Sequence, residues 1–200
     1  MPRHIACLTF DFDVWSGWTA RNLMTPTPVS RGEFGLVGAQ RILDLLRKYG
    51  IKSSWFIPGV VIDSHTEACE RVVREGHEVA HHGYSHLPPA SMPAEKEEAE
   101  LLRARDCIKR LTGHYPRGYR SASWDLSPVT IDLLLKHGFD YESSMMGHDY
   151  MPYFARQGDK PAIDEPFEFG AETRLVELPI SWTLDDYPHF EFVRTKDYVL

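Results

Sequence analysis

Two carboxylates stand at the end of a short apolar run near the start of the chain, where residues 5–10 lead into Asp11-Phe12-Asp13. Successive side chains of an extended strand alternate between its two faces, so Asp11 and Asp13 point to the same side. Two neighbouring buried carboxylates cannot both stay ionised without a cation or a proton. The pair therefore predicts a metal site or acid–base chemistry. The alternative is a loop that starts at Asp11 and leaves both acids in water.

A second polar cluster follows another strand-like run and contains His82 and His86. The spacing His-x-x-x-His places two imidazoles one helical turn apart, so that both can reach one ion. Together with one aspartate they form a site of two histidines and one carboxylate that leaves positions open for water and substrate. This ligand set suits zinc, iron, cobalt or manganese, and we predict a divalent cation, with zinc as the first choice.

Short apolar runs alternate with helical stripes that end at glycines, which predicts an α/β fold with a parallel sheet and right-handed crossovers. An open doubly wound sheet and a (β/α) barrel both satisfy this pattern. Long loops are expected over residues 14–36, directly after the paired acids, and over residues 145–171. The expected strands are 5–10, 51–57, 78–82, 119–123, 139–144 and 175–181, and the expected helix stops are Gly50, Gly76, Gly113 and Gly138.

The composition narrows the classes of partner. The 200 residues carry a formal charge of -7 and no basic run, which argues against nucleic acid and against an anionic membrane surface. The three cysteines, Cys7, Cys69 and Cys107, lack paired spacing and are predicted to be buried free thiols. The chain shows neither the apolar core of a signal peptide nor a run that could span a bilayer, so a cytoplasmic protein is expected. Its partners are then small molecules or glycans, and a homo-oligomer is compatible with the sequence.

Four motifs in order resemble those of the polysaccharide deacetylase (NodB-homology) superfamily. Within it they are similar to the branch that contains peptidoglycan deacetylase-like, allantoinase-like and cyclic imide hydrolase proteins. The resemblance covers nearly the whole chain. The motifs are Thr9-Phe10-Asp11-Phe12-Asp13, His82 through His86, Tyr119-Arg120-Ser121-Ala122-Ser123-Trp124-Asp125 and Leu178-Pro179-Ile180-Ser181-Trp182.

The resemblance implies a distorted (β/α) barrel with a metal site at the carboxyl ends of its strands. It implies that Asp13, His82 and His86 are the ligand triad, that Asp11 is the general base, and that Arg120 orients this base. A guanidinium can hold a carboxylate through two parallel hydrogen bonds, which we expect for Arg120 and Asp11. In this chain Phe12 separates acids that are adjacent in many family members, so the exchanged assignment of Asp11 and Asp13 stays open.

The end of the chain departs from the family pattern. No strand with a Leu-x-His general acid follows Trp182, and Leu135-Lys136-His137 matches only by letter because it lies at a predicted helix end. A parallel barrel needs about 250 residues. We therefore expect residues 1–200 to form one NodB-like domain whose last strands would lie beyond Leu200.

Three aromatic residues near the motifs are candidates for substrate binding: Trp15, Trp124 and Tyr187. They could stack on a sugar or close a small pocket, and Trp15 could equally anchor its loop to the core. The predicted function is metal-dependent hydrolysis of a non-peptide carbon–nitrogen bond, in an N-acetylated sugar polymer or in a small cyclic imide or ureide. The alternative is a catalytically silent metal- or carbohydrate-binding module. An iron oxygenase fits less well, by analogy of fold.

Overall fold

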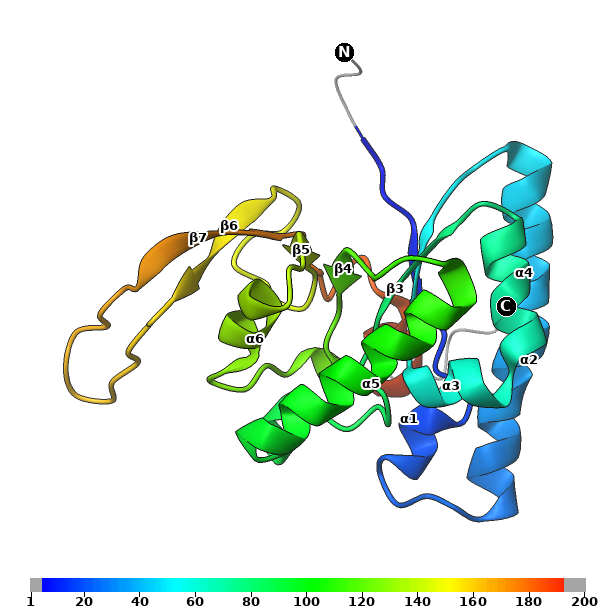
Figure 1. Ribbon diagram of the computed structural model, residues 1–200, viewed down its shortest axis with the longest axis horizontal. Helices are drawn as coiled ribbons and strands as arrows, with labels where there is room; N and C mark the ends of the chain where they lie inside the picture. Colours follow the sequence, from blue (N-terminus) through cyan, green and yellow to red (C-terminus); the bar gives the residue numbers. More distant parts are fainter. Residues whose placement is uncertain (1–4, 193–200) are drawn as a thin grey trace.

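A computed structural model describes residues 5–192 and contains a seven-stranded sheet in the order β1-β2-β3-β4-β5-β7-β6 (Figure 1). Strands β1 to β5 and β7 are parallel, and β6 runs antiparallel to β7. The predicted α/β class is confirmed. The strands are β1 Thr9–Asp11, β2 Ser54–Ile57, β3 Glu78–His81, β4 Gly118–Tyr119, β5 Tyr141–Glu142, β6 Tyr153–Gln157 and β7 Ala171–Glu177. The helices are α1 Ser16–Thr19, α2 Pro26–Tyr49, α3 Gly59–Ser64, α4 Thr66–Arg74, α5 Ala94–Thr112 and α6 Thr130–Lys136, with η1 Pro89–Ser91, η2 Ala122–Trp124 and η3 Pro188–Phe192.

The predicted helix stops are confirmed. The cap residues of α2 and α5, Gly50 and Gly113, have φ of 65° and 86°, which a side chain with a Cβ adopts only at a cost. Both glycines return the chain to the sheet. Within the described part of the chain, no helix has the length and apolar character needed to cross a membrane.

The buried apolar residues form two clusters, one on each half of the sheet. The first lies between the strands β1 to β3 and the helices α2 to α5, and includes Leu43, Trp55 and Ile108. The second joins α6 to β4 and β7 through Leu134 and Leu175. The helices thus cover one face of the strands, whereas Phe56 on the other face contacts Arg120, His82 and Tyr141.

The loop predicted over residues 14–36 is wrong, because this segment forms α1 and the first half of α2. Pro26 and Pro28 lie in the first turn of α2, where a backbone N–H has no partner within the helix in any case. Gly32 brings α2 against the turn that follows β1, since a Cβ at this position would lie 2.4 Å from the Cα of Trp15. The long helix therefore supports the segment that carries the paired acids.

The first strand is shorter and more exposed than predicted. It starts at Thr9, Ile5 is 80% exposed, and Cys7 is exposed rather than buried. The reason is that β1 pairs only with β2 among the described residues, so that it forms an edge of the sheet. Cys69 and Cys107 are buried free thiols, as predicted.

The loop predicted over residues 145–171 is also wrong in part, because it contains β6, which pairs with β7 in a hairpin that packs against α6 and whose far end extends beyond it (Figure 1). Since β1 and β6 are both edges, the strands of residues 5–192 do not close a barrel. The expectation about strands beyond Leu200 lies outside the described residues.

Candidate metal centre

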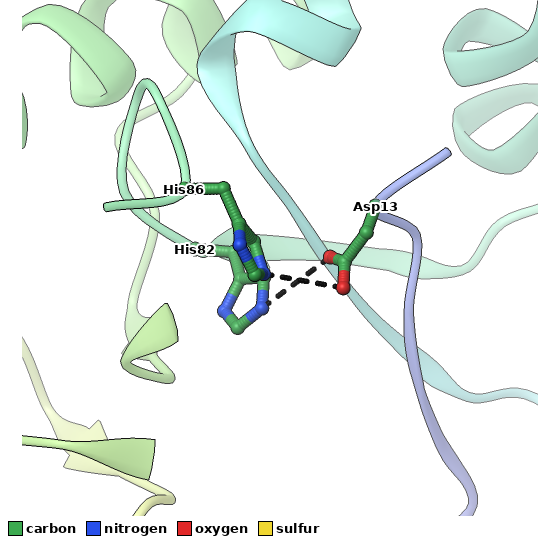
Figure 2. A group of neighbouring side chains, drawn as sticks. All are labelled: Asp13, His82 and His86. Carbon is green, nitrogen blue, oxygen red and sulfur yellow. Dashed lines mark ion pairs between the residues drawn. The ribbon is translucent and has the colours of Figure 1, made fainter. Parts of the chain in front are cut away.

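The side chains of Asp13, His82 and His86 converge at the carboxyl ends of β1 and β3 (Figure 2). Their nearest ligand atoms all lie within 4.8 Å of one another. The distance from Asp13 Oδ1 to His82 Nε2 is 3.4 Å, and that from Asp13 Oδ2 to His86 Nε2 is 3.2 Å. The structure thus brings together the three residues that the sequence analysis proposed as the ligand triad.

Strand alternation places the first histidine. His81 and His82 are both buried, but they point to opposite faces, since His81 Nε2 lies 3.0 Å from the carbonyl oxygen of Leu101 on α5. His82 points toward the aspartates. Parallel strands end at the same edge of a sheet, so His82 after β3 and Asp13 after β1 meet there across β2.

The segment from His82 to His86 is a tight loop, and the predicted helical turn is wrong. Gly83 has φ of 72° and His86 has φ of 63°. A non-glycine residue with positive φ is costly and is usually held by its surroundings. The loop is fixed here by the backbone N–H and the hydroxyl of Ser85, which both donate to Glu100 on α5.

The donor set of the triad fits a metal ion. Asp13 Oδ1 and His82 Nε2 are buried and have no hydrogen-bond partner among the described residues. Unpaired buried polar atoms are costly, and these two point at the same place. His82 Nδ1 lies 2.7 Å from the carbonyl oxygen of Arg120, a hydrogen bond that holds the proton on Nδ1 and leaves Nε2 with a lone pair for a cation.

The charges of the triad keep its carboxylate ionised. Burial alone would raise the pKa of Asp13, but the charges of His86 and His82 outweigh it and lower that pKa to about 2. Burial lowers the pKa of His82, although both aspartates oppose the shift. Metal ligands must be a carboxylate and neutral imidazoles. Asp13 and His82 tend toward that state, whereas the charge of Asp13 outweighs burial and raises the pKa of His86, so a cation would have to displace a proton from His86.

The guanidinium of Arg120 lies beside the triad and is divided among three residues. Its Nη1 donates to Asp11 Oδ1 at 2.7 Å, Nε donates to the carbonyl oxygen of Ser143 at 2.9 Å, and Nη2 donates to Thr9 Oγ1 and Ser143 Oγ. The predicted pair of parallel bonds to Asp11 is wrong, because the second edge of the guanidinium is used by Ser143. Asp11 Oδ2 is then left on the side of the triad, 3.8 Å from His82 Nε2.

Thr9 and Ser143 were not identified from the sequence. Thr9 could have been found, because it precedes Asp11 by two residues and shares its face of β1. Ser143 gives no local signal, since its contact with Arg120 spans 23 residues of sequence.

The three predicted substrate-binding aromatics differ in their contacts. Trp15 packs against the first core cluster and donates from Nε1 to His65 Nε2 at 3.1 Å, which is the anchoring alternative. Trp124 has φ of 55° and meets Trp182 edge to face, with 5.8 Å between ring centroids. Tyr187 is 42% exposed and accepts a hydrogen bond from Arg21. A role of Trp124 and Tyr187 in substrate binding stays a prediction.

His137, the letter match to the family's acid, lies at the end of α6 as expected. Its Nε2 is 2.6 Å from Glu98 Oε1 on α5. His137 therefore links α6 to α5.

Comparison with known proteins agrees with this geometry. A family model described as polysaccharide deacetylase matches residues 36–141. The chain is 42% identical to a peptidoglycan deacetylase of Helicobacter pylori over 92% of this chain and 67% of that protein. It is 30% identical to a peptidoglycan deacetylase-like protein of Gibberella zeae, over 93% of this chain and 60% of that one. The chain belongs to the polysaccharide deacetylase family.

Solved structures support the same assignment. A crystal structure from Mycobacterium smegmatis, assigned to the polysaccharide deacetylases, matches with 31% identity and a TM-score of 0.74, over 96% of this chain and 63% of that one. An allantoinase structure matches with 23% identity and a TM-score of 0.66, over 82% of this chain and 51% of that one, and shares the fold alone. The chain thus spans between half and two thirds of the length of these relatives.

Proposed function

We propose that this protein is a metal-dependent deacetylase that hydrolyses the acetamide carbon–nitrogen bond of an N-acetylated sugar in a peptidoglycan-type glycan. The observation that carries the proposal is the pairing of the ligand triad with a separate carboxylate, Asp11, which is held by a buried arginine. A site that only binds metal needs neither Asp11 nor Arg120. This pairing argues for catalysis against the silent binding module.

Asp13, His82 and His86 would hold the cation. When bound there, a divalent cation lowers the pKa of a water molecule and polarises an amide carbonyl, and zinc suits these ligands. The assignment of Asp13 as ligand and Asp11 as base is supported by their partners. Both oxygens of Asp13 face imidazole nitrogens, whereas one oxygen of Asp11 is engaged by Arg120.

The role of Asp11 is to accept a proton. Its Oδ1 is fixed by Arg120, so its Oδ2 is presented toward the triad, where an attacking water would lose a proton. A general base works only when it is held within hydrogen-bonding reach of that proton. The products are a free amine and acetate. The positive charge of Arg120 would also stabilise negative charge that develops on the carbonyl oxygen.

The glycan class of substrate is favoured by the relatives, two of which are named for peptidoglycan deacetylation. The exposed aromatic rings of Trp182 and Tyr187 suit the apolar face of a sugar. The hydrolysis of cyclic imides or ureides would need a closed pocket, and no observation on the described residues favours it.

The experiment is a substrate panel with controlled metal content. The full-length protein is stripped with a chelator, reloaded with zinc, cobalt, manganese or iron, and incubated with N-acetylglucosamine oligomers, peptidoglycan fragments, succinimide and allantoin. Release of acetate from the glycans, restored by metal and lost in Asp11→Asn, is the expected result. Ring opening of the imides without acetate release would replace the proposed substrate class. Metal binding without turnover on any substrate would favour the silent module.

A further inference from the structure

Two glutamates outside the metal centre are completely buried side by side. Glu142 on β5 and Glu177 on β7 are register partners of neighbouring parallel strands, and both are 0% exposed (Figure 1). Two carboxylates that touch in a buried place repel each other and cannot both be ionised without a cation or a proton. No step of the proposed reaction uses either of them.

The contacts of the pair identify which oxygen carries the proton. Glu142 accepts the backbone N–H and the hydroxyl of Ser144, and Glu177 Oε1 accepts the N–H of Met145 at 3.1 Å. Glu177 Oε2 is buried and has no hydrogen-bond partner among the described residues. A hydrogen bond between two carboxyl groups needs a proton on one of them, and Oε2 of Glu177 is the oxygen free to carry it.

We propose that Glu142 and Glu177 share one proton, carried on Glu177, and that the pair is a positioning device that fixes the segment of residues 143–145 against Arg120. The catalytic part of this proposal rests on the proposed function, because Arg120 matters for turnover only if Asp11 is the base. The shared proton does not depend on that function.

The link to the site runs through two serines. The Ser144 hydroxyl oxygen accepts the N–H of Ser121 at 2.8 Å, so the hydroxyl proton must go to Glu142. Ser143, the residue between Glu142 and Ser144, accepts two hydrogen bonds from Arg120. An ionised Glu142 therefore holds Ser144 of this segment, while Arg120 holds Ser143.

The electrostatic surroundings favour one retained proton. Burial, together with the hydrogen bond and the charge of Glu142, raises the pKa of Glu177 to about 11. Tyr119 on β4 and Tyr153 on β6 also interact with the pair. Burial raises the pKa of both tyrosines, so they stay uncharged and leave the proton in place.

The test compares three variants of the full-length protein. In Glu177→Gln an amide NH₂ replaces the hydroxyl as donor to Glu142, and the amide oxygen still accepts from Met145, so kcat should stay within about threefold of the parent. In Glu142→Gln an amide nitrogen faces one of the two donors of Ser144, so kcat should fall about tenfold or more with KM and metal content unchanged. Glu177→Leu removes the donor to Glu142, so its kcat should fall as in Glu142→Gln. The near-normal kcat of Glu177→Gln then shows that a conservative replacement at this position restores turnover.

A second measurement needs no substrate. Because the folded-state pKa of Glu177 lies above its value of 4.5 in the unfolded chain, its contribution to stability is complete below pH 4.5 and is lost as pH rises toward about 11. Between pH 6 and 9 the folding equilibrium constant of the parent should fall about tenfold per pH unit relative to that of Glu177→Gln. Parallel pH dependence in the two proteins would overturn the shared proton. Equal loss of kcat in the two glutamine variants would overturn the positioning role. Inactivity of the parent on all substrates would instead refute the proposed function.

Discussion

The substitution Arg120→Lys isolates the geometry of the guanidinium from its charge. The Arg120 side chain is 7% exposed and makes four hydrogen bonds, to Asp11, Thr9 and twice to Ser143. An ammonium has its three donors on one atom and cannot reach acceptors on opposite edges of a planar fork. We expect lysine to keep the contact with Ser143 and to lose the bonds to Asp11 and Thr9.

The size of the effect follows from the number of bonds lost. If two bonds to a charged group are lost at about 1.5 kcal/mol each, the folded site loses about 3 kcal/mol of interaction. Release of Asp11 from its fixed position should lower kcat about a hundredfold, as expected when a general base is no longer held in place. Metal content should not change, because His82 is held by the backbone carbonyl of residue 120, which any residue supplies.

The assay measures kcat and KM on the best glycan substrate, with metal content and thermal melting of the same sample. The matched control is Arg117→Lys, three residues earlier, where the arginine side chain is 76% exposed and pairs with Asp140 on the surface. The control should be close to the parent in all three measurements, since exposed ion pairs contribute little. Turnover of Arg120→Lys within about threefold of the parent, with the fold intact, would refute the reasoning.

Three further predictions concern the metal and the thiols. Alanine at any member of the ligand triad should lower the metal content measured by elemental analysis, whereas Asp11→Asn should keep the metal and lose about a hundredfold or more in kcat; an empty site in Asp11→Asn would exchange the roles of the two aspartates. Chelation should lower the melting temperature and zinc should restore it, because a ligand that binds only the folded state stabilises it; an unchanged melting temperature would count against a metal in the triad. Iodoacetamide should modify Cys7 in the folded protein but Cys69 only after unfolding, because Cys69 is buried and burial raises the pKa of its thiol to about 12. Mass spectrometry measures the labelling, and rapid modification of both cysteines in the folded protein would contradict the fold.

The sequence was most informative where local periodicity coincides with the fold. Alternation along a strand was enough to place Asp11 and Asp13 on one face, and the shared edge of parallel strands brought His82 to them. The glycine stops marked the ends of helices such as α2 and α5 because a positive φ is needed there. These features depend on a few neighbouring residues.

The features that were missed depend on tertiary contacts. The prolines at the start of α2 were interpreted as helix breakers, although proline is well accommodated in a first turn. The loop that carries His86 has positive φ at two positions, and it is held by Glu100 on another element. The hydrogen bonds of Arg120 are shared between Asp11, Thr9 and Ser143, and the local sequence gives no sign that Ser143 contacts Arg120.

The hydrogen bonds that Arg120 donates to Thr9 and Ser143 lead to a last prediction. Nη2 of Arg120 donates to both hydroxyls, to Thr9 Oγ1 at 3.1 Å and to Ser143 Oγ at 2.9 Å. In Thr9→Val or in Ser143→Ala one acceptor remains, so each single variant should lose only about twofold to fivefold in kcat. In the double variant Nη2 is buried without either acceptor, and the guanidinium should turn away from Asp11.

The loss of kcat in that double variant should therefore exceed the product of the two single losses, by about 1 kcal/mol of coupling or more. The backbone oxygen of Ser143 still accepts from Nε in every variant, so the fold should persist and melting temperatures can serve as the check. If the two effects simply multiply, the hydroxyls act independently of Arg120, and the guanidinium is held at Asp11 by the remaining two bonds alone.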